Sequence, residues 1–486
     1  MSPPFLSPFY FLEGAFFGSC YFFTFYLPAF FFSVYLQYIF SYLLMKYLCF
    51  LVFTTLFSLS LNAQQSYNMS LLGKLEYQEG LNDVWGYVDD FENEYAIVGL
   101  INGISIVDVT DPSNLIEKVF IPGPRSIWRD IKTFGHYAYV VHDLLTEPGS
   151  QGILIIDLAD VANDYVTYTS FLPNYFSRFH NLFIDESGIL YLFGGDFGDG
   201  GLLIYDIFSN PLDPVLLGDY QDFYLHDGMV RGDTLWGSAI YAGLLVAVDV
   251  SNKSNPNLIG SVSTPNNFTH NAWVSDDGTT VFTTDEVVGA YIAAVDVSDI
   301  SNMTVIDQIQ SWSPETNVIP HNTHVHGKYL ITSYYCDGVT VVDASDPSNL
   351  QEVAYYDTSD STGGTYSGAW GTYPWLPSGN ILVSDRQEGL HVLAIDNLNF
   401  SSEDLKSLLD VKISSNPTSN QFIIHLNEEY VLQVYSIDGS LVDVIETSST
   451  ANRLSIGSEW QVGTYILKVI NSQGLSASYK LIKTSL

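Results

Sequence analysis

The clearest pattern in this sequence is a short apolar run that ends in aspartate and occurs seven times. One copy is Gly338–Asp343 (GVTVVD), which is followed by a turn rich in Asp, Pro, Ser and Asn. The other copies are Gly103–Asp108, Gly152–Asp157, Gly201–Asp206, Gly243–Asp249, Gly289–Asp296 and Gly389–Asp396. The closing aspartates lie 43 to 53 residues apart, a period typical of repeat arrays such as propeller blades. Because an aspartate before such a turn accepts hydrogen bonds from the turn backbone, we interpret all seven as structural.

Each repeat predicts four short antiparallel strands, named A to D here, with turn residues between them. In the third repeat they are His180–Ile184, Gly188–Gly194, Gly201–Asp206 and Pro214–Tyr220. The seven apolar runs are the C strands, and their composition is typical of strands buried between neighbouring sheets. The seventh repeat stops after its C strand, whereas Leu71–Tyr77 has the pattern of a D strand. We therefore predict an all-β fold, a seven-bladed β-propeller of four-stranded blades whose N-terminal strand closes the last blade.

The repeated phrase also carries a family resemblance. The segment GVTVVDASDPSNL and its variant GISIVDVTDPSNL resemble the LVIVD repeat. The span from about 70 to 397 is similar to the choice-of-anchor B proteins, which are secreted bacterial propellers with varied C-terminal anchoring modules. The resemblance implies a fold and a location for residues 64–397, but it implies no activity.

A separate module, residues 410–486, follows a linker at 398–409. Its alternating segments predict a small immunoglobulin-like β-sandwich with strands at Val411–Ile413, Phe422–His425, Val431–Tyr435, Leu441–Glu446, Tyr465–Ile470 and Ala477–Lys483. The module resembles the type A sorting domain of the type IX secretion system of Bacteroidetes through Asn416-Pro417-Thr418, Tyr435–Gly439, Gly463-Thr464-Tyr465 and Lys480–Lys483. The resemblance implies that this secretion machinery is a partner and that the protein is secreted or displayed on the outer-membrane surface.

Two segments precede the repeats. Residues 1–44 are nearly uncharged and rich in Phe and Tyr, which taken literally is a membrane-spanning segment. Met45-Lys46, the apolar run Tyr47–Leu61 and the small residue Ala63 instead fit a signal peptide. We interpret residues 45–63 as that signal peptide, cleaved near Ala63-Gln64, and residues 1–44 as a mistaken upstream extension. No stable transmembrane anchor is then expected in the mature protein, and a genuine anchor is the alternative.

Charge and cysteine content narrow the function classes. The formal net charge is -37 with only 17 Lys and Arg residues, which excludes nucleic acid as a partner because no basic stripe can neutralise phosphates. Three cysteines, Cys20, Cys49 and Cys336, give no disulfide framework, and Cys336 is expected to be a small buried hydrophobe. Neither a nucleophile elbow with flanking glycines nor an H-E-x-x-H motif occurs in the sequence.

The starts of the A strands carry the candidate chemistry. Aligning the repeats places a histidine at one shared position in the third to sixth repeats, namely at His180, His226, His270 and His321. The same position holds Trp85, Arg129 and Trp370 in the first, second and seventh repeats. Strand A is innermost in a propeller, so this position faces the mouth of the central channel. The adjacent B strands end at the same mouth and bring the carboxylates of Asp143, Asp196, Asp285, Glu286 and Asp385 there. Of these, Asp196, Asp285 and Asp385 are the predicted ligand-site acids.

Three interpretations of this mouth stay open. The histidines are structural and bond to neighbouring blades, or all these side chains form a site for a glycan or peptide ligand, with the aromatic rings as flat surfaces. In the third interpretation the four histidines bind a divalent metal ion, which is the only cofactor that the sequence suggests. The leading function is a secreted or cell-surface binding module. The alternatives are a metal-dependent hydrolase or lyase at the same mouth and a structural surface protein, and no residue is assigned as catalytic.

Overall fold

The computed structural model describes residues 38–47, 65–143, 152–313, 317–396 and 411–484, with gaps in the last range at 415, 417, 427–428, 437–440, 448–452 and 472–475. The chain divides into two units, Met1–Ala63 and Gln64–Leu486. In the first unit the described residues form one helix, residues 38–47. None of the helices that the structure describes is long and apolar enough to cross a bilayer. The predicted signal peptide and upstream extension lie largely outside the described residues.

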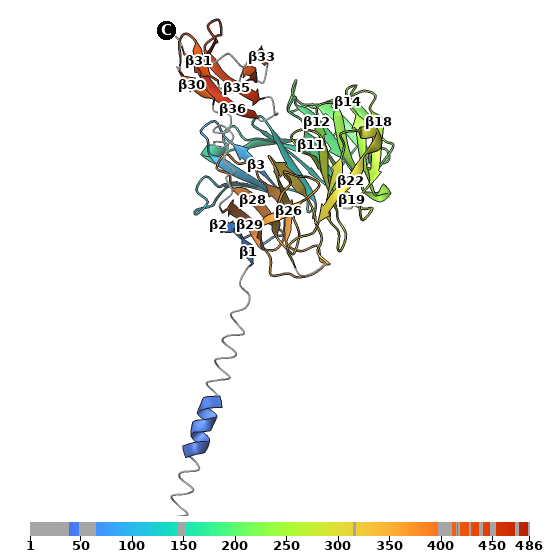
Figure 1. Cartoon of the computed structure of the whole chain (residues 1–486), viewed down its shortest axis with the longest axis vertical. Helices are drawn as coiled ribbons and strands as arrows, with labels where there is room; N and C mark the ends of the chain where they lie inside the picture. The colour runs from blue at the N-terminus through green and yellow to red at the C-terminus, as the bar shows by residue number, and fades with distance from the viewer. Residues whose placement is uncertain are drawn as a thin grey trace, which may run out of the picture. The chain divides into compact units, whose positions relative to one another are not determined.

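Seven antiparallel sheets follow one another along residues 65–396 (Figure 1). The first three contain β3 (Leu81–Val88), β4 (Glu94–Leu100), β5 (Gly103–Asp108) and β6 (Ile116–Pro122); β7 (Arg129–Phe134), β8 (Tyr137–His142), β9 (Ile153–Asp157) and β10 (Thr167–Phe171); and β11 (Asn181–Ile184), β12 (Ile189–Phe193), β13 (Leu202–Asp206) and β14 (Val215–Tyr220). The fourth and fifth contain β15 (Asp227–Arg231), β16 (Thr234–Ala239), β17 (Leu244–Asp249) and β18 (Asn257–Ser263); and β19 (Thr269–Val274), β20 (Thr280–Asp285), β21 (Ile292–Asp296) and β22 (Thr304–Ile309).

The last two sheets both recruit a strand from the start of the second unit. They contain β23 (Thr323–His326), β24 (Tyr329–Ser333), β25 (Val339–Asp343), β26 (Gln351–Tyr356) and β1 (Ser66–Tyr67); and β27 (Ala369–Tyr373), β28 (Ile381–Asp385), β29 (Gly389–Ile395) and β2 (Met69–Leu75). Short 3-10 turns occur at Val161–Asn163, Ile240–Ala242 and Ile300–Asn302. Each of the seven apolar runs forms the third strand of one sheet, which confirms the predicted all-β fold.

The seven sheets close into a ring. Their first strands contact one another in cyclic order, from β3 through β7, β11, β15, β19, β23 and β27 back to β3. The ring is fastened by β2, which pairs antiparallel with β29 and places Ser70 opposite Ala394. This confirms the predicted closure by an N-terminal strand, which leaves β29 without a free edge. The short strand β1, which the sequence analysis did not predict, pairs with β26.

Apolar side chains fill the space between neighbouring sheets. Along β4, Tyr95 and Ile97 belong to the core shared with the second sheet, whereas Ala96 and Val98 belong to the core shared with the seventh. Because side chains alternate between the two faces of a strand, a strand between two sheets needs apolar residues at every position. This requirement explains the nearly continuous apolar composition of the repeated phrase.

The aspartate at the end of each third strand has the structural role expected from the sequence. In six sheets its Oδ1 accepts a hydrogen bond from the backbone N–H two residues later, over 2.8 to 3.0 Å. In the seventh sheet Asp396 accepts one from the Ser70 hydroxyl at 3.0 Å. The six bonds to backbone N–H groups order the turn that leads to the outermost strand, whereas the bond of Asp396 joins β29 to the closing strand β2.

The C-terminal module consists of two sheets. One contains β30 (Lys412–Ser414), β31 (Phe422–His425) and β34 (Arg453–Ile456), and the other contains β32 (Tyr430–Ser436), β33 (Leu441–Glu446), β35 (Gly463–Asn471) and β36 (Ser476–Lys483). Phe422, Leu432, Leu467 and Leu481 are fully buried in one core that both sheets share. The six predicted strands are confirmed, and β34 is an additional one. The predicted linker at 398–409 lies outside the described residues.

Candidate functional site

Four imidazoles lie side by side where the innermost strands begin. His180 and His226 directly precede β11 and β15, His270 lies in β19, and His321 lies two residues before β23. The centroids of successive rings are 4.0, 4.5 and 4.5 Å apart. The shared register on four neighbouring strands thus becomes one continuous row of rings, which we call the histidine row.

Each end of the histidine row is held by a hydrogen-bonding partner. At one end, Asp143 Oδ2 lies 3.1 Å from His180 Nδ1, and Arg178 bonds to the same carboxylate. At the other end, His321 Nδ1 lies 2.5 Å from the carbonyl oxygen of Trp370, whose ring centroid is 4.5 Å from that of the imidazole. A carbonyl oxygen only accepts hydrogen bonds, so Nδ1 of His321 carries the proton and its Nε2 keeps a lone pair.

Glu286, the residue after β20, brings a carboxylate to the middle of the row. Its Oε2 lies 3.6 Å from His270 Nε2 and its Oε1 lies 3.9 Å from His321 Nε2. The Tyr335 hydroxyl donates to Oε1 at 2.5 Å. The Nε2 atom of His226 is buried and has no hydrogen-bond partner. One ligand atom each from His226, His270 and Glu286 lie within 4.8 Å of one another.

Burial keeps three of these imidazoles neutral. Desolvation is the largest cause lowering the pKa of His226, His270 and His321, and neighbouring imidazoles lower it further. For His270 the negative charge of Glu286 acts in the opposite direction, and the pKa is still lowered. The side chains of His270 and His321 are 4% and 2% exposed. A neutral imidazole has a free lone pair, which is the form that binds a metal ion.

The three predicted acids do not join the row, because each of them organises a loop. Asp196 accepts hydrogen bonds from the backbone N–H of Ser177 and Arg178, just before His180. Asp285 accepts from the Thr264 hydroxyl and from backbone N–H groups in the loop leading into β19. Asp385 accepts from the Thr358 hydroxyl and from the backbone of the turn after β28. Asp196 and Asp285 therefore position the segments that carry His180 and His270.

The remaining predicted residues are spread over different parts of the channel. Trp370 packs against His321 at the end of the row and is 4% exposed. The Arg129 side chain is 1% exposed, and its guanidinium donates to the carbonyl oxygens of Leu100, Ile101 and Pro124. Trp85 contacts the rings of His324, Tyr373 and Trp375 and lies under the Lys132 ammonium, 4.2 Å from its ring centroid. The structure thus brings the four histidines and Trp370 together and places Arg129 and Trp85 elsewhere.

Asp143 and Glu286 were expected at this mouth from the sequence, but they were not among the predicted ligand-site acids. Both follow the end of a second strand, so their place in the repeat was the available signal. Sequence position alone did not separate Glu286, which meets the imidazoles, from Asp285, which turns to the loop. The difference arises because successive residues of an extended chain point in opposite directions.

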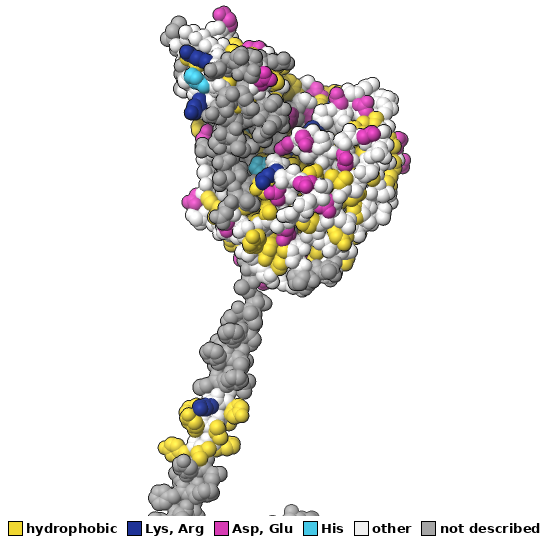
Figure 2. Space-filling view, in the orientation of Figure 1, with side chains coloured by type: hydrophobic (Ala, Val, Ile, Leu, Met, Phe, Trp, Pro, Cys, Tyr) yellow, Lys and Arg dark blue, Asp and Glu magenta, His cyan; other side chains and the backbone are white. Residues whose placement is uncertain are grey.

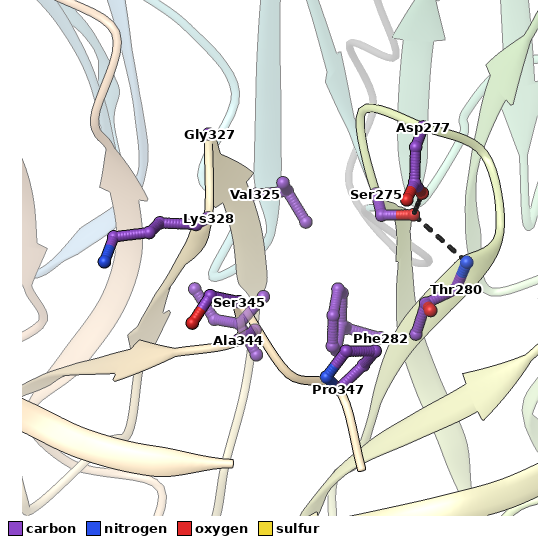
Figure 3. A pocket seen from close by; sticks show the side chains of 11 residues that line it. Ser275, Asp277, Thr280, Phe282, Val325, Gly327, Lys328, Ala344, Ser345 and Pro347 are labelled. Atoms are coloured by element: carbon purple, nitrogen blue, oxygen red, sulfur yellow. Dashed lines mark hydrogen bonds between the residues drawn. The ribbon is translucent and has the colours of Figure 1, made fainter. Parts of the chain in front are cut away.

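Two small cavities lie among the described residues. One, of about 80 Å³, lies between the fifth and sixth sheets, at the turns that follow β19, β23 and β25, and its lining includes Ser275, Phe282 and Pro347 (Figure 3). The other, of about 10 Å³, lies in the channel and is lined by residues that follow those of the histidine row, including Asn181 and Asp227. Both are far smaller than the roughly 300–1,000 Å³ of a typical small-molecule site. The visible outer surface carries scattered acidic groups and few basic ones (Figure 2).

Models of known families match both parts of the second unit, the ring of sheets and the C-terminal module. The LVIVD repeat matches residues 87–120, 191–222, 239–264 and 321–358. The chain carries LVIVD repeats. Together with the ring of four-stranded sheets, these repeats make residues 65–396 a β-propeller.

The same comparison identifies the C-terminal module. The secretion system C-terminal sorting domain matches residues 412–484. This is the sorting domain of the type IX secretion system, so the LVIVD-repeat chain is recognised by that machinery and exported to the cell surface or the extracellular space. No curated protein matches the chain.

Proposed function

We propose that the LVIVD-repeat propeller is an exported binding domain and that its ligand is a divalent transition-metal ion held at the histidine row. The ligands are His226, His270 and Glu286. The observation that carries the proposal is that one donor atom of each lies within 4.8 Å of the others, while the buried Nε2 of His226 has no other partner. A buried polar atom without a partner is costly, and an ion bound there would remove that cost.

The chemistry of the donors supports an ion of the zinc class. Two neutral imidazoles and one carboxylate are a common ligand set for zinc and related divalent ions. Neighbouring groups also hold a ligand and the adjacent imidazole in place. Tyr335 donates to Glu286, and the Trp370 carbonyl orients the neighbouring ring of His321. Such contacts fix the tautomer and direction of metal ligands.

The burial of the histidine row favours an ion over the glycan or peptide considered from the sequence. His270, His321 and Trp370 are almost completely buried. A sugar ring stacks on an exposed aromatic face. Trp370 is almost completely buried, and the partly buried ring of Trp85 is packed against His324, Tyr373 and Trp375 and lies under the Lys132 ammonium.

The alternative function, a metal-dependent hydrolase or lyase, would use the same metal ion. One feature favours it, because three protein ligands leave a fourth position open for water in a tetrahedral site. His321 is the side chain that decides between the two functions, since its Nε2 lies 3.9 Å from Glu286 Oε1. If His321 binds the ion, the site is closed and serves binding; if it does not, a metal-bound water has room.

The test is elemental analysis of the purified full chain beside a His226→Gln/His270→Gln variant. His136→Gln is the matched control, because His136 is a half-exposed histidine of the propeller that lies outside the row. We expect close to one zinc, iron or copper ion per chain in the wild type and in the control, and at least about tenfold less in the double variant. Equal metal content in the wild type and the double variant, or no uptake by the wild type from excess zinc, would contradict the proposal.

We also propose that the exported chain begins near Gln64, after removal of a signal peptide. The supporting pattern is the positive Lys46, the apolar run Tyr47–Leu61 and the small Ala63. Mass spectrometry of the N-terminal peptide of the secreted protein tests this boundary, and a peptide from residues 1–40 in the secreted fraction would contradict it.

A further inference from the structure

The C-terminal module has one long edge strand that pairs with no further strand among the described residues. Its four-stranded sheet has the order β33-β32-β35-β36, so β33 and β36 are the two edges. The edge of β36 is closed by the segment before β31. The side-chain amide of Asn416 bonds to the backbone of Lys480 and Ile482, and Thr418 pairs with Lys483 in an isolated bridge. The six-residue strand β33 has no such cover in the part of the chain that the structure describes.

The side chains along β33 are apolar and exposed. Leu441, Val442 and Val444 are 56%, 40% and 48% exposed. The edges of the other sheet differ, because β30 has three residues and the exposed Lys412, and β34 has four residues and the exposed Arg453. Short edges that carry Lys or Arg disfavour pairing with another chain, whereas a longer apolar edge favours it.

The pairing of β33 with β32 leaves backbone groups that point away from the sheet. The backbone N–H of Thr447, just after β33, donates to the carbonyl oxygen of Tyr430 in β32 at 2.9 Å. Because hydrogen-bonded positions alternate along an antiparallel strand, the N–H of Ile445 also faces β32, and the N–H of Val444 faces away from it. An apolar edge with outward N–H and C=O groups is a surface to which an extended segment of another protein adds as a further strand.

The length and charge of β33 favour a different protein over a second copy of this chain as its partner. Six residues span about 20 Å, so pairing two such edges would cover only about 200 Å² of each copy. A stable interface needs roughly 600 Å² per partner. In addition, β33 contains Asp443 and Glu446 but no Lys or Arg, so a second copy would bring only acidic groups to the contact. The module matches the sorting domain of a secretion system, whose machinery is therefore the partner that this edge fits.

We propose that β33 is the strand through which the secretion machinery recognises the module. An extended segment of a machinery protein adds to the outer edge of β33, with apolar side chains against Val442 and Val444 and a basic side chain near Asp443. This surface is independent of the metal site, because it uses no residue of the propeller.

The test is export of the full chain in a bacterium that carries the type IX secretion system, measured by immunoblots of the medium, the cell surface and the periplasm. The variant Val442→Lys/Val444→Lys places two charges on the apolar edge. The variant Val444→Pro removes an outward N–H that β32 does not use, a change that edge strands tolerate. Val462→Lys is the matched control, because Val462 is 64% exposed in the same module and lies outside β33. Limited proteolysis of the purified chains checks that the module is folded in each variant.

We expect export of both edge variants to fall at least about fivefold, with folded protein held in the periplasm, because each change opposes the addition of a strand. Export of the control should stay within about twofold of the wild type. Wild-type export of either edge variant with a folded module would overturn the proposal. A wild-type dimer in light scattering that dissociates in Val442→Lys/Val444→Lys would assign the edge to a second copy and would overturn it as well.

Discussion

At the residue scale, the partner that each channel side chain finds depends on the direction in which its strand presents it. Asp285 and Glu286 are neighbours in sequence, yet one orders the loop before β19 and the other meets the imidazoles. Arg129 shares the repeat position of the histidines, but its length lets it reach the carbonyl groups of the first sheet. Residues at the same position of different repeats can therefore have different roles.

Because Arg129 bonds only to backbone carbonyl oxygens in the structure, we expect its replacement to lower the stability of the protein and to leave its metal content unchanged. Arg129→Leu removes a charged donor from three carbonyl oxygens, at a cost of about 2–3 kcal/mol in the free energy of unfolding. Arg125→Leu is the control, because the Arg125 side chain is 63% exposed and pairs with Glu79 at the surface, where the loss should be below about 1 kcal/mol. Urea unfolding measures both. If Arg129→Leu loses its metal ion but keeps the stability of the wild type, Arg129 belongs to the metal site and is not a structural residue.

We expect the titration of Glu352, which lies outside the histidine row, to make the stability of the folded protein depend on pH. Burial, and the nearby charge of Asp337, raise the pKa of Glu352 from 4.5 to about 8, although a backbone N–H of Trp312 bonds to its carboxylate and opposes the shift. The folded protein then holds a proton that the unfolded chain releases above its ordinary pKa. Glu352 therefore contributes less to stability as pH rises from about 4.5 to 8.

The Glu352→Gln variant removes this titration and keeps a hydrogen-bond acceptor for Trp312. We expect it to match the wild type in stability near pH 4.5 and to become more stable than the wild type as pH approaches 8 and beyond. Thermal melts of both proteins across this range measure the difference. A stability difference that does not change between pH 4.5 and 8 would show that Glu352 does not titrate in this window.

At the element scale, the fold depends on a strand supplied from the N-terminal side of the repeats. In β2, Met69 is buried against the sixth and seventh sheets, and the pairing with β29 leaves that strand without a free edge. Gly73 passes so close to Pro112 that a Cβ at this position would lie 1.8 Å from the Pro112 carbonyl oxygen. The closing strand therefore fits tightly against a turn of the first sheet.

This closure predicts different consequences for two N-terminal truncations. A chain that begins at Asn68 loses only β1, the short fifth strand, and should unfold within about 3 °C of the chain that begins at Gln64. A chain that begins at Gln78 also loses β2 and should unfold at least about 10 °C lower, with aggregation through the exposed edge of β29. Calorimetry measures both. Equal melting temperatures for the two truncated chains would show that β2 does not close the ring.

The elements were largely predictable because apolar content and period dictate them. The seven apolar runs gave the third strands, and the pattern of Leu71–Tyr77 predicted the closing strand. The two-residue β1 and the short β34 lack enough positions to show a period. For the candidate site, the sequence could predict only that the four histidines share one position in the repeat. Which carboxylate meets the imidazoles depends on loop paths and side-chain directions, and these have no periodic signal in the sequence.

At the scale of the whole molecule, composition and architecture agree with export. A net charge of -37 keeps a secreted protein soluble, and the C-terminal sorting domain is the part that the secretion machinery recognises. The propeller places its imidazoles and buried acids in the channel, away from this outer acidic surface. The general acidity of the chain therefore does not explain the chemistry of the site.

X-ray diffraction from crystals of the zinc-loaded protein, recorded on both sides of the zinc absorption edge, tests the metal site at the histidine row most directly. We expect one strong anomalous peak, about 2.0–2.2 Å from an imidazole nitrogen of His226, an imidazole nitrogen of His270 and a carboxylate oxygen of Glu286. The distance from this peak to His321 Nε2 would then show whether a fourth protein ligand closes the site. Crystals that contain zinc but show no peak among these three residues would rule out the proposed metal site.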